Sequence, residues 1–103
     1  MHSYNVIFST EAEQDINIRA KYIAQDLSSI ETAARYINGI YDFCESLAFF
    51  PNRSVKRDDL ASNLRITNFK GSSVIAYRID EENKTVYILR VFNSRQNYKN
   101  LLK

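Results

Sequence analysis

The sequence predicts a single α+β domain in which two helices cover an antiparallel sheet. Two helix start signals, each followed by apolar residues at helical spacing, precede a lone proline at Pro51. Three runs of β-forming residues with short turns between them follow the proline. A chain of 103 residues suits one domain, residues 1–103, with a modest core. We therefore expect the element order β-α-α-β-β-β, with a short C-terminal helix after it.

The first half begins with a short strand candidate, Tyr4–Phe8. Thr10-Glu-Ala-Glu13 then matches a capping box, in which the threonine hydroxyl and the second glutamate satisfy free backbone N–H groups. Apolar residues at helical spacing carry this helix to about Leu27. They are Ile16, Ala20, Ile23 and Leu27.

A second capping box, Ser28-Ser-Ile-Glu31, follows at once. The next apolar stripe ends before Pro51, because proline disfavours helix in the residue before it. Its members are Ala33, Ile37, Ile40, Cys44 and Leu47. Two helices with so short a connection predict an antiparallel hairpin.

The second half predicts an antiparallel meander of three strands. They are Leu64–Phe69, Ser73–Ile79 and Val86–Phe92, joined by turns at Lys70-Gly71 and Asp80–Lys84. Val86–Phe92 is a nearly continuous run of β-forming residues, which predicts a strand near the middle of the sheet. Arg90 is the single charge in this run. Ser94 is positioned to cap a last helix over about Arg95–Lys103.

Strand pairing predicts a shared face for three arginines. If Phe69 pairs with Ser72, and Asp80 with Lys84, then one face carries Arg65, Arg78 and Arg90. Arg95 follows just beyond the sheet. Guanidinium groups on an open face suit phosphate or carboxylate recognition. The alternative is that each arginine pairs with a nearby acid or packs its stem on apolar surface.

The net charge of +2 hides an asymmetry. Residues 1–52 carry three basic and seven acidic side chains, whereas residues 53–103 carry eleven basic and five acidic ones. The irregular segment 52–63 adds Arg53, Lys56 and Arg57 to the basic half. Such a bias suits an anionic partner, either nucleic acid or an acidic protein, although solubility alone also explains it.

Other functional classes find little support. The single cysteine, Cys44, lies at helical spacing among apolar residues, so we expect a core thiol and no disulfide or multi-cysteine zinc site. We assign the single histidine, His2, no catalytic role, and we expect no metal and no cofactor. No apolar run reaches the roughly 18–20 residues that span a bilayer, and no leader is evident, so we expect a cytoplasmic protein.

These motifs together resemble the RelE/ParE superfamily of bacterial toxins. The likeness rests on the YNVIF strand, the Thr-x-Ala-Glu helix start, the LAFFP helix end and, above all, AYRIDEENKTVYILRVFNSRQNY. It implies the toxin of a type II toxin–antitoxin pair, neutralised by a cognate antitoxin that wraps around it, as a dimer or heterotetramer. It also implies one of two targets, DNA gyrase for ParE-like members or ribosome-bound mRNA for RelE-like members.

Two departures bear on the target. The nuclease members tend to set basic residues along the second and third strands; Arg65 matches one such position, but Thr67 and Val74 stand at its neighbours. ParE-like chains often carry histidine where this chain has Asn93, while Arg95 and Tyr98 keep the matching spacing. Acid–base candidates for RNA cleavage are few.

The favoured hypothesis is therefore a gyrase poison without chemistry of its own. The alternatives are a ribosome-dependent mRNA endonuclease, with Arg65, Arg95 and Tyr98 as catalytic candidates, and a non-toxic member that only binds a partner. We expect the antitoxin to contact the C-terminal residues Tyr98, Leu101 and Leu102. The expected target-binding residues are Arg53, Lys56, Arg57, Arg65, Arg78, Arg90 and Arg95.

Overall fold

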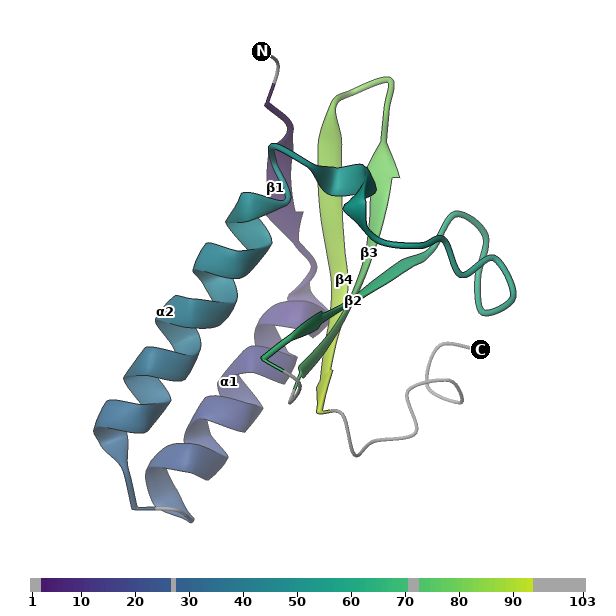
Figure 1. The fold of residues 1–103 in the computed structure, drawn as a ribbon. Helices are drawn as coiled ribbons and strands as arrows, with labels where there is room; N and C mark the ends of the chain where they lie inside the picture. The colour runs from purple at the N-terminus through teal and green to yellow at the C-terminus, as the bar shows by residue number, and fades with distance from the viewer. Residues whose placement is uncertain (1–2, 27, 71–72, 94–103) are drawn as a thin grey trace.

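The computed structural model describes residues 3–26, 28–70 and 73–93 as two layers, a helix hairpin and a four-stranded sheet (Figure 1). The two helices lie side by side and run in opposite directions, as predicted. The elements in chain order are β1 Asn5–Phe8, α1 Thr10–Gln25, α2 Ile30–Ser46, the short 3₁₀ helix η1 Pro51–Arg53, β2 Arg65–Phe69, β3 Ser73–Asp80 and β4 Thr85–Asn93. This order confirms the predicted α+β fold; the predicted C-terminal helix lies outside the described residues.

The sheet has the strand order β1-β4-β3-β2. Strands β2, β3 and β4 form the predicted antiparallel meander, and β4 lies inside the sheet as expected. Strand β1 pairs with β4 in parallel, so the sheet is mixed and not purely antiparallel. A parallel pair needs a long crossover connection, and here the helix hairpin between β1 and β2 provides part of it.

Both helix caps lie one residue away from the predicted positions. Ser9 caps α1, because its backbone is extended and its Oγ accepts the Ala12 N–H at 3.0 Å. Ser29 caps α2 in the same way, accepting the Thr32 N–H at 3.2 Å. Ser28 instead adopts a left-handed conformation, φ 53°, in the connection between the helices. Each helix keeps a serine cap, which satisfies otherwise free N–H groups.

The predicted strand register is wrong. Phe69 pairs with Ser73, and Asp80 with Thr85, one residue beyond the predicted partner in each case. Strand β4 also contains a bulge, because Ile88 pairs with Tyr77, Arg90 with Ala76, and Leu89 between them has no partner. A slip of one residue moves a side chain to the other face of a sheet.

The new register separates the arginines. Arg65 pairs with Tyr77, which packs in the core beneath the helices, so Arg65 belongs to the helix-facing side of the sheet. Arg78 follows Tyr77 in β3 and therefore points to the opposite side. Arg90 pairs with Ala76, two residues before Arg78, and so belongs by register to the same side as Arg78. The predicted face shared by all three arginines does not form, because Arg65 lies on the other side.

The main core lies between the hairpin and the sheet. Tyr77, Ile40 and Cys44 are among its fully buried members. The predicted core position of Cys44 is thus confirmed, and burial raises the pKa of its thiol to about 12. A second cluster covers the other face of the sheet, where Val74 and Phe92 pack with Leu60 and Leu64 from the preceding loop. The face predicted to be open is therefore partly apolar and covered.

The loop between η1 and β2 is ordered by backbone contacts. Lys56 forms an isolated antiparallel bridge with Arg65, and the Arg57 N–H donates to the Leu64 carbonyl. The loop places a basic segment beside the edge strand β2.

No helix in the described ranges is both long enough and apolar enough to span a membrane.

Candidate functional site

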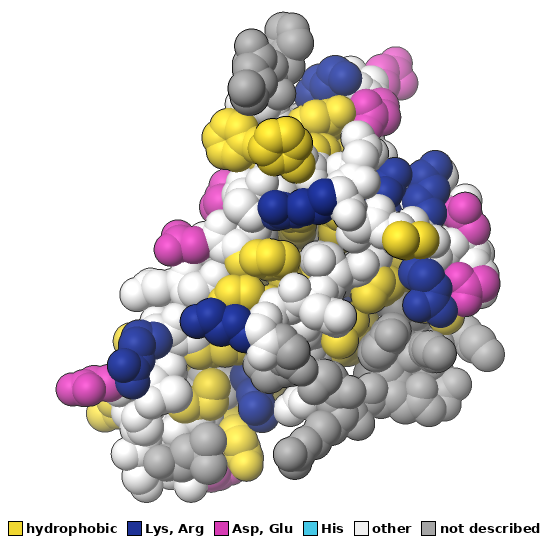
Figure 2. Space-filling model, in the orientation of Figure 1, with side chains coloured by type: hydrophobic (Ala, Val, Ile, Leu, Met, Phe, Trp, Pro, Cys, Tyr) yellow, Lys and Arg dark blue, Asp and Glu magenta, His cyan; other side chains and the backbone are white. Residues whose placement is uncertain are grey.

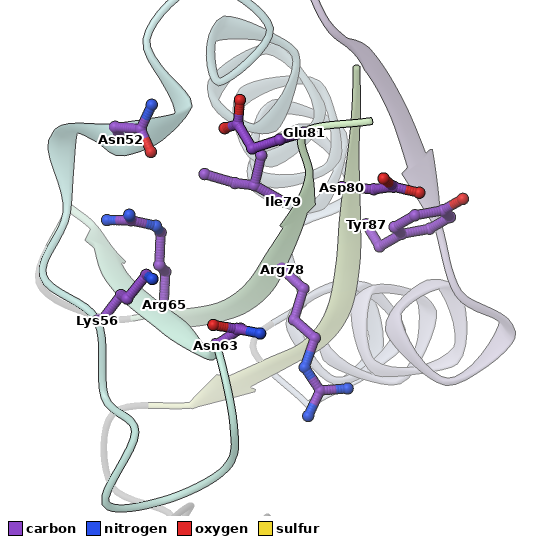
Figure 3. A pocket seen from close by; sticks show the side chains of 9 residues that line it. All are labelled: Asn52, Lys56, Asn63, Arg65, Arg78, Ile79, Asp80, Glu81 and Tyr87. Atoms are coloured by element: carbon purple, nitrogen blue, oxygen red, sulfur yellow. The ribbon is translucent and has the colours of Figure 1, made fainter. Parts of the chain in front are cut away.

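A pocket of about 550 Å³ lies between the loop 52–63 and the β3–β4 hairpin. Figure 3 shows Asn52, Lys56 and Arg65 on one side of this space and Arg78, Ile79 and Glu81 on the other. Asn63, Asp80 and Tyr87 complete the lining. We call this space the basic pocket, because Lys56, Arg65 and Arg78 contribute three of its side chains.

Arg65 is oriented by the loop. Its Nη1 donates a hydrogen bond to the backbone carbonyl of Ser54, and the backbone bridge to Lys56 brings the two cations together. This bond uses one N–H of the Arg65 guanidinium, so the other N–H donors of the group can bind a ligand. The sequence placed Lys56 and Arg65 on separate elements; the fold makes them neighbours.

Arg78 enters from β3. Its Nε donates to the Ser62 carbonyl at 3.0 Å, so the same loop holds both guanidinium groups. In the part of the chain that the structure describes, no carboxylate forms an ion pair with Lys56, Arg65 or Arg78. The three positive charges are therefore uncompensated by salt bridges there.

Two acids lie at the hairpin end of the basic pocket. Asp80 accepts hydrogen bonds from the Asn83 side chain at 2.8 Å and the Asn83 N–H at 3.1 Å, and these bonds lower the pKa of its carboxyl. Glu81 accepts from the Tyr4 hydroxyl at 2.9 Å and lies 3.5 Å from Lys84 Nζ. Both carboxylates are thus bound to groups of the turn and of the neighbouring segments, away from the cations.

Tyr77 supports the loop from below. Its buried hydroxyl donates to the Pro51 carbonyl at 2.7 Å and lies 2.5 Å from Ser54 Oγ. Burial raises the pKa of this phenol, so it stays protonated at neutral pH. Tyr77 therefore holds in place the segment that carries Ser54, whose carbonyl orients Arg65.

Arg90 belongs to a different place. Its guanidinium binds Asp15 of α1, with Nε–Oδ2 at 2.8 Å, and these hydrogen bonds raise the pKa of Arg90. The pair lines a second pocket of about 480 Å³, where Ile18, Tyr22 and Phe92 add apolar surface. Ile18 is 69% exposed. The role of Arg90 as a target contact stays a prediction; in the structure its guanidinium forms an ion pair with Asp15 of α1.

Arg53 and Arg57 line a third pocket of about 420 Å³ beside Thr67. Arg53 donates to Ser46 Oγ at 2.5 Å and lies over the Phe43 ring, whereas Arg57 forms an ion pair with Asp59 at 2.9 Å. Figure 2 shows basic side chains scattered over this face among hydrophobic ones, and not gathered in one patch. The remaining predicted site residues, Arg95, Tyr98, Leu101 and Leu102, lie outside the described residues.

The comparison with protein families identifies the chain. Residues 6–98 match the family model described as the ParE toxin of the type II toxin–antitoxin system parDE. The chain belongs to this family. The expected membership of the RelE/ParE superfamily is confirmed, and with it the assignment as a toxin of a type II toxin–antitoxin system.

Solved structures share the fold of this ParE-family toxin. A chain of the chromosomal ParDE toxin–antitoxin system from P. aeruginosa matches with a TM-score of 0.75 at 17% identity, covering 90% of this chain and 98% of the other. The toxin–antitoxin complex RelBE2 from Mycobacterium tuberculosis matches at 0.66 and 26% identity, covering 90% and 93%. A mutant of the E. coli toxin RelE in the free state matches at 0.62 and 10% identity, covering 96% and 92%. A search of curated proteins finds no match.

Several residues of these sites were missed in the sequence. Asn52, Asn63 and Tyr87 line the basic pocket but carry no local signal of a site. Asp15 could have been found, because a lone arginine in an apolar strand requires a counter-ion and Asp15 borders the apolar stripe of α1. The pairing itself depends on how the helix packs on the sheet.

Proposed function

We propose that this ParE-family toxin inhibits bacterial growth by binding and poisoning DNA gyrase in the cytoplasm, without cleaving RNA itself. The basic pocket is the proposed contact surface, with Lys56, Arg65 and Arg78 as its charged contacts. Of the other predicted target contacts, Arg53 and Arg57 lie in the same loop and take part at the edge of the contact surface. The observation that carries this proposal is the presence of three cations for which the described residues offer no ion-pair partner, with Arg65 and Arg78 held by backbone carbonyls.

The ionisable groups near these cations favour binding over RNA cleavage. Attack by a ribose hydroxyl needs a group that takes up a proton and one that supplies a proton near neutral pH. Burial raises the pKa of Tyr77, and the hydrogen bonds from Asn83 lower the pKa of Asp80, so both groups move away from neutrality. Val74, at a position where nuclease members tend to carry a basic residue, is only 4% exposed and packs in the second core.

We further propose that a cognate antitoxin neutralises the chain. The ParDE and RelBE2 structures with the same fold are, by their descriptions, toxin–antitoxin systems. The groove beside Asp15 and Arg90 is a suitable docking place, because Ile18 and Tyr22 expose apolar surface there. Docking there would complement the predicted contacts of Tyr98, Leu101 and Leu102.

The decisive experiment is to induce the chain without an antitoxin and to follow DNA and protein synthesis by pulse labelling. Early loss of DNA synthesis with an SOS response, together with cleavage complexes formed by purified gyrase, is the expected result. Early loss of translation with cuts in ribosome-bound mRNA would support the endonuclease in its place. Unchanged growth in the presence of folded protein would leave a partner-binding member of the family.

A further inference from the structure

We propose that the basic pocket binds an acidic peptide segment, in which one glutamate or aspartate carboxylate lies against Lys56 and Arg65, a second lies against Arg78, and apolar neighbours rest on Ile79 and Tyr87. This inference rests on the proposed function, in which gyrase is the protein that supplies the segment.

The donors of the pocket are oriented before any ligand arrives. Arg65 donates from Nη1 to Ser54, and Arg78 donates from Nε to Ser62, so each guanidinium is anchored through one nitrogen. Each group keeps other N–H donors, and a carboxylate accepts such forks with favourable geometry. Anchoring lowers the entropy that the side chains lose on binding.

The shape and size of the pocket fit a short peptide. A space of about 550 Å³ is within the range of sites that enclose a few side chains. Asn52 and Asn63 contribute amides, which both donate and accept and so suit a peptide backbone. Tyr87, 37% exposed, and the half-buried Ile79 supply apolar surface beside the charges.

The distribution of charge favours a peptide over a nucleic acid. Three cations lie along the loop side and β3, but Asp80 and Glu81 stand at the hairpin end. A phosphodiester strand carries a charge at every nucleotide, so a strand that follows the pocket meets the two carboxylates and is repelled. A peptide places its carboxylates at the cations and a neutral or basic residue at the acidic end.

The test is an NMR titration of the labelled chain with three probes, observing the Nε–H signals of Arg65 and Arg78. The probes are a short capped peptide rich in Glu and Leu, the same peptide with every Glu replaced by Gln, and an oligo-dT strand of similar length. We expect the Glu peptide to shift both signals and to bind at least about tenfold more tightly than the Gln peptide. A larger shift with oligo-dT, or displacement of the peptide by it, would overturn the inference in favour of nucleic acid; no shift with any probe would also overturn it.

Matched variants separate this inference from the proposed function. Lys56→Gln should weaken the Glu peptide by about tenfold, whereas Lys21→Gln on the outer surface of α1 removes the same charge and should change nothing. Equal weakening by both variants would show a general charge effect and contradict a built site. If Lys56→Gln abolishes peptide binding but leaves gyrase inhibition intact, the pocket binds an acidic peptide and the proposed gyrase surface is wrong.

Discussion

Arg90 in β4 donates two hydrogen bonds to the carboxylate of Asp15 in α1, from Nε at 2.8 Å and from Nη2 at 3.1 Å. The same carboxylate accepts the Val91 N–H at 2.9 Å. The pairing of β1 with β4 ends at Phe8 and Ile88, so β1 offers no acceptor at Val91, and Asp15 provides one. One side chain thus compensates a charge and a backbone group.

Replacing Asp15 with alanine should lower the free energy of unfolding by about 2–4 kcal/mol, because the change leaves a partly buried arginine and a backbone N–H without their acceptor. The Asp15 side chain is 15% exposed and that of Arg90 is 31% exposed, so solvent replaces the lost bonds only in part. Urea unfolding measures the effect. The control is Asp42→Ala, an exposed acid on α2, which should change the free energy by no more than about 0.5 kcal/mol. Equal effects from the two variants would contradict the role of the pair.

Tyr77→Phe should destabilise the chain by about 1–3 kcal/mol, because it leaves the Pro51 carbonyl and the Ser54 hydroxyl without their buried partner. Limited proteolysis should then cut the loop 52–63 faster than in the unchanged chain. Tyr87→Phe removes a hydroxyl from a residue that is 37% exposed, and we expect a change within about 0.5 kcal/mol. Loss of stability without faster loop cleavage would show that Tyr77 supports the core and not the loop.

Reversing the charge at Lys56 should reduce inhibition of gyrase by at least about tenfold, since a glutamate there repels an acidic ligand in a pocket held by two arginines. Lys21→Glu makes the same change in net charge on α1 and should retain full inhibition. Supercoiling assays with the purified proteins give the comparison. Retention of activity by Lys56→Glu would remove the basic pocket from the proposed target surface.

Cys44 should resist modification by a thiol reagent at pH 8 in the folded chain and react readily in denaturant. Burial raises its pKa from 9.0 to about 12, so the reactive thiolate is scarce and the sulfur is shielded. The folded state binds the proton of the Cys44 thiol more tightly than the unfolded state does. The contribution of this proton binding to the free energy of unfolding is therefore complete below pH 9 and is lost as the pH rises towards 12. Since the chain has one cysteine, the reaction reports on this site alone. Rapid modification of Cys44 under native conditions would contradict the burial of this thiol.

Gly39→Ala tests the contact between α2 and β2. An added Cβ would lie 3.0 Å from Cζ of Phe69, which is tight, while alanine improves helix propensity by about 1 kcal/mol. The Phe69 ring is only partly buried and can rotate away, so we expect a net stabilisation of about 0.5 kcal/mol. Thermal unfolding measures the change. A destabilisation that disappears in the Phe69→Ala background would show that the ring cannot move.

The errors in the predicted strand register share one cause. Each turn was expected to be one residue shorter than it is, but Lys70 and Lys84 adopt left-handed conformations, φ 51° and 49°, at positions next to the strand ends. Such residues lengthen a hairpin loop and move its register. The sequence does not predict this conformation for either lysine, because glycine and asparagine are the residues that usually adopt it. The displaced β2–β3 register then put Arg65 on the other side of the sheet from Arg78, whereas the bulge in β4 kept Arg90 on the side of Arg78.

The sequence by itself determined the features that depend on neighbouring residues. Capping motifs within one residue of the true caps, apolar spacing and Pro51 were sufficient for the helix hairpin, and the apolar run around Leu89 was sufficient for the inner strand β4. The burial of Cys44 followed from the same spacing. Only the tertiary structure decided that Arg90 binds Asp15 and that Lys56, Arg65 and Arg78 line one pocket. Those relationships join segments far apart in the chain, and they depend on strand register, on a bulge and on the path of a loop, which packing of the whole domain selects.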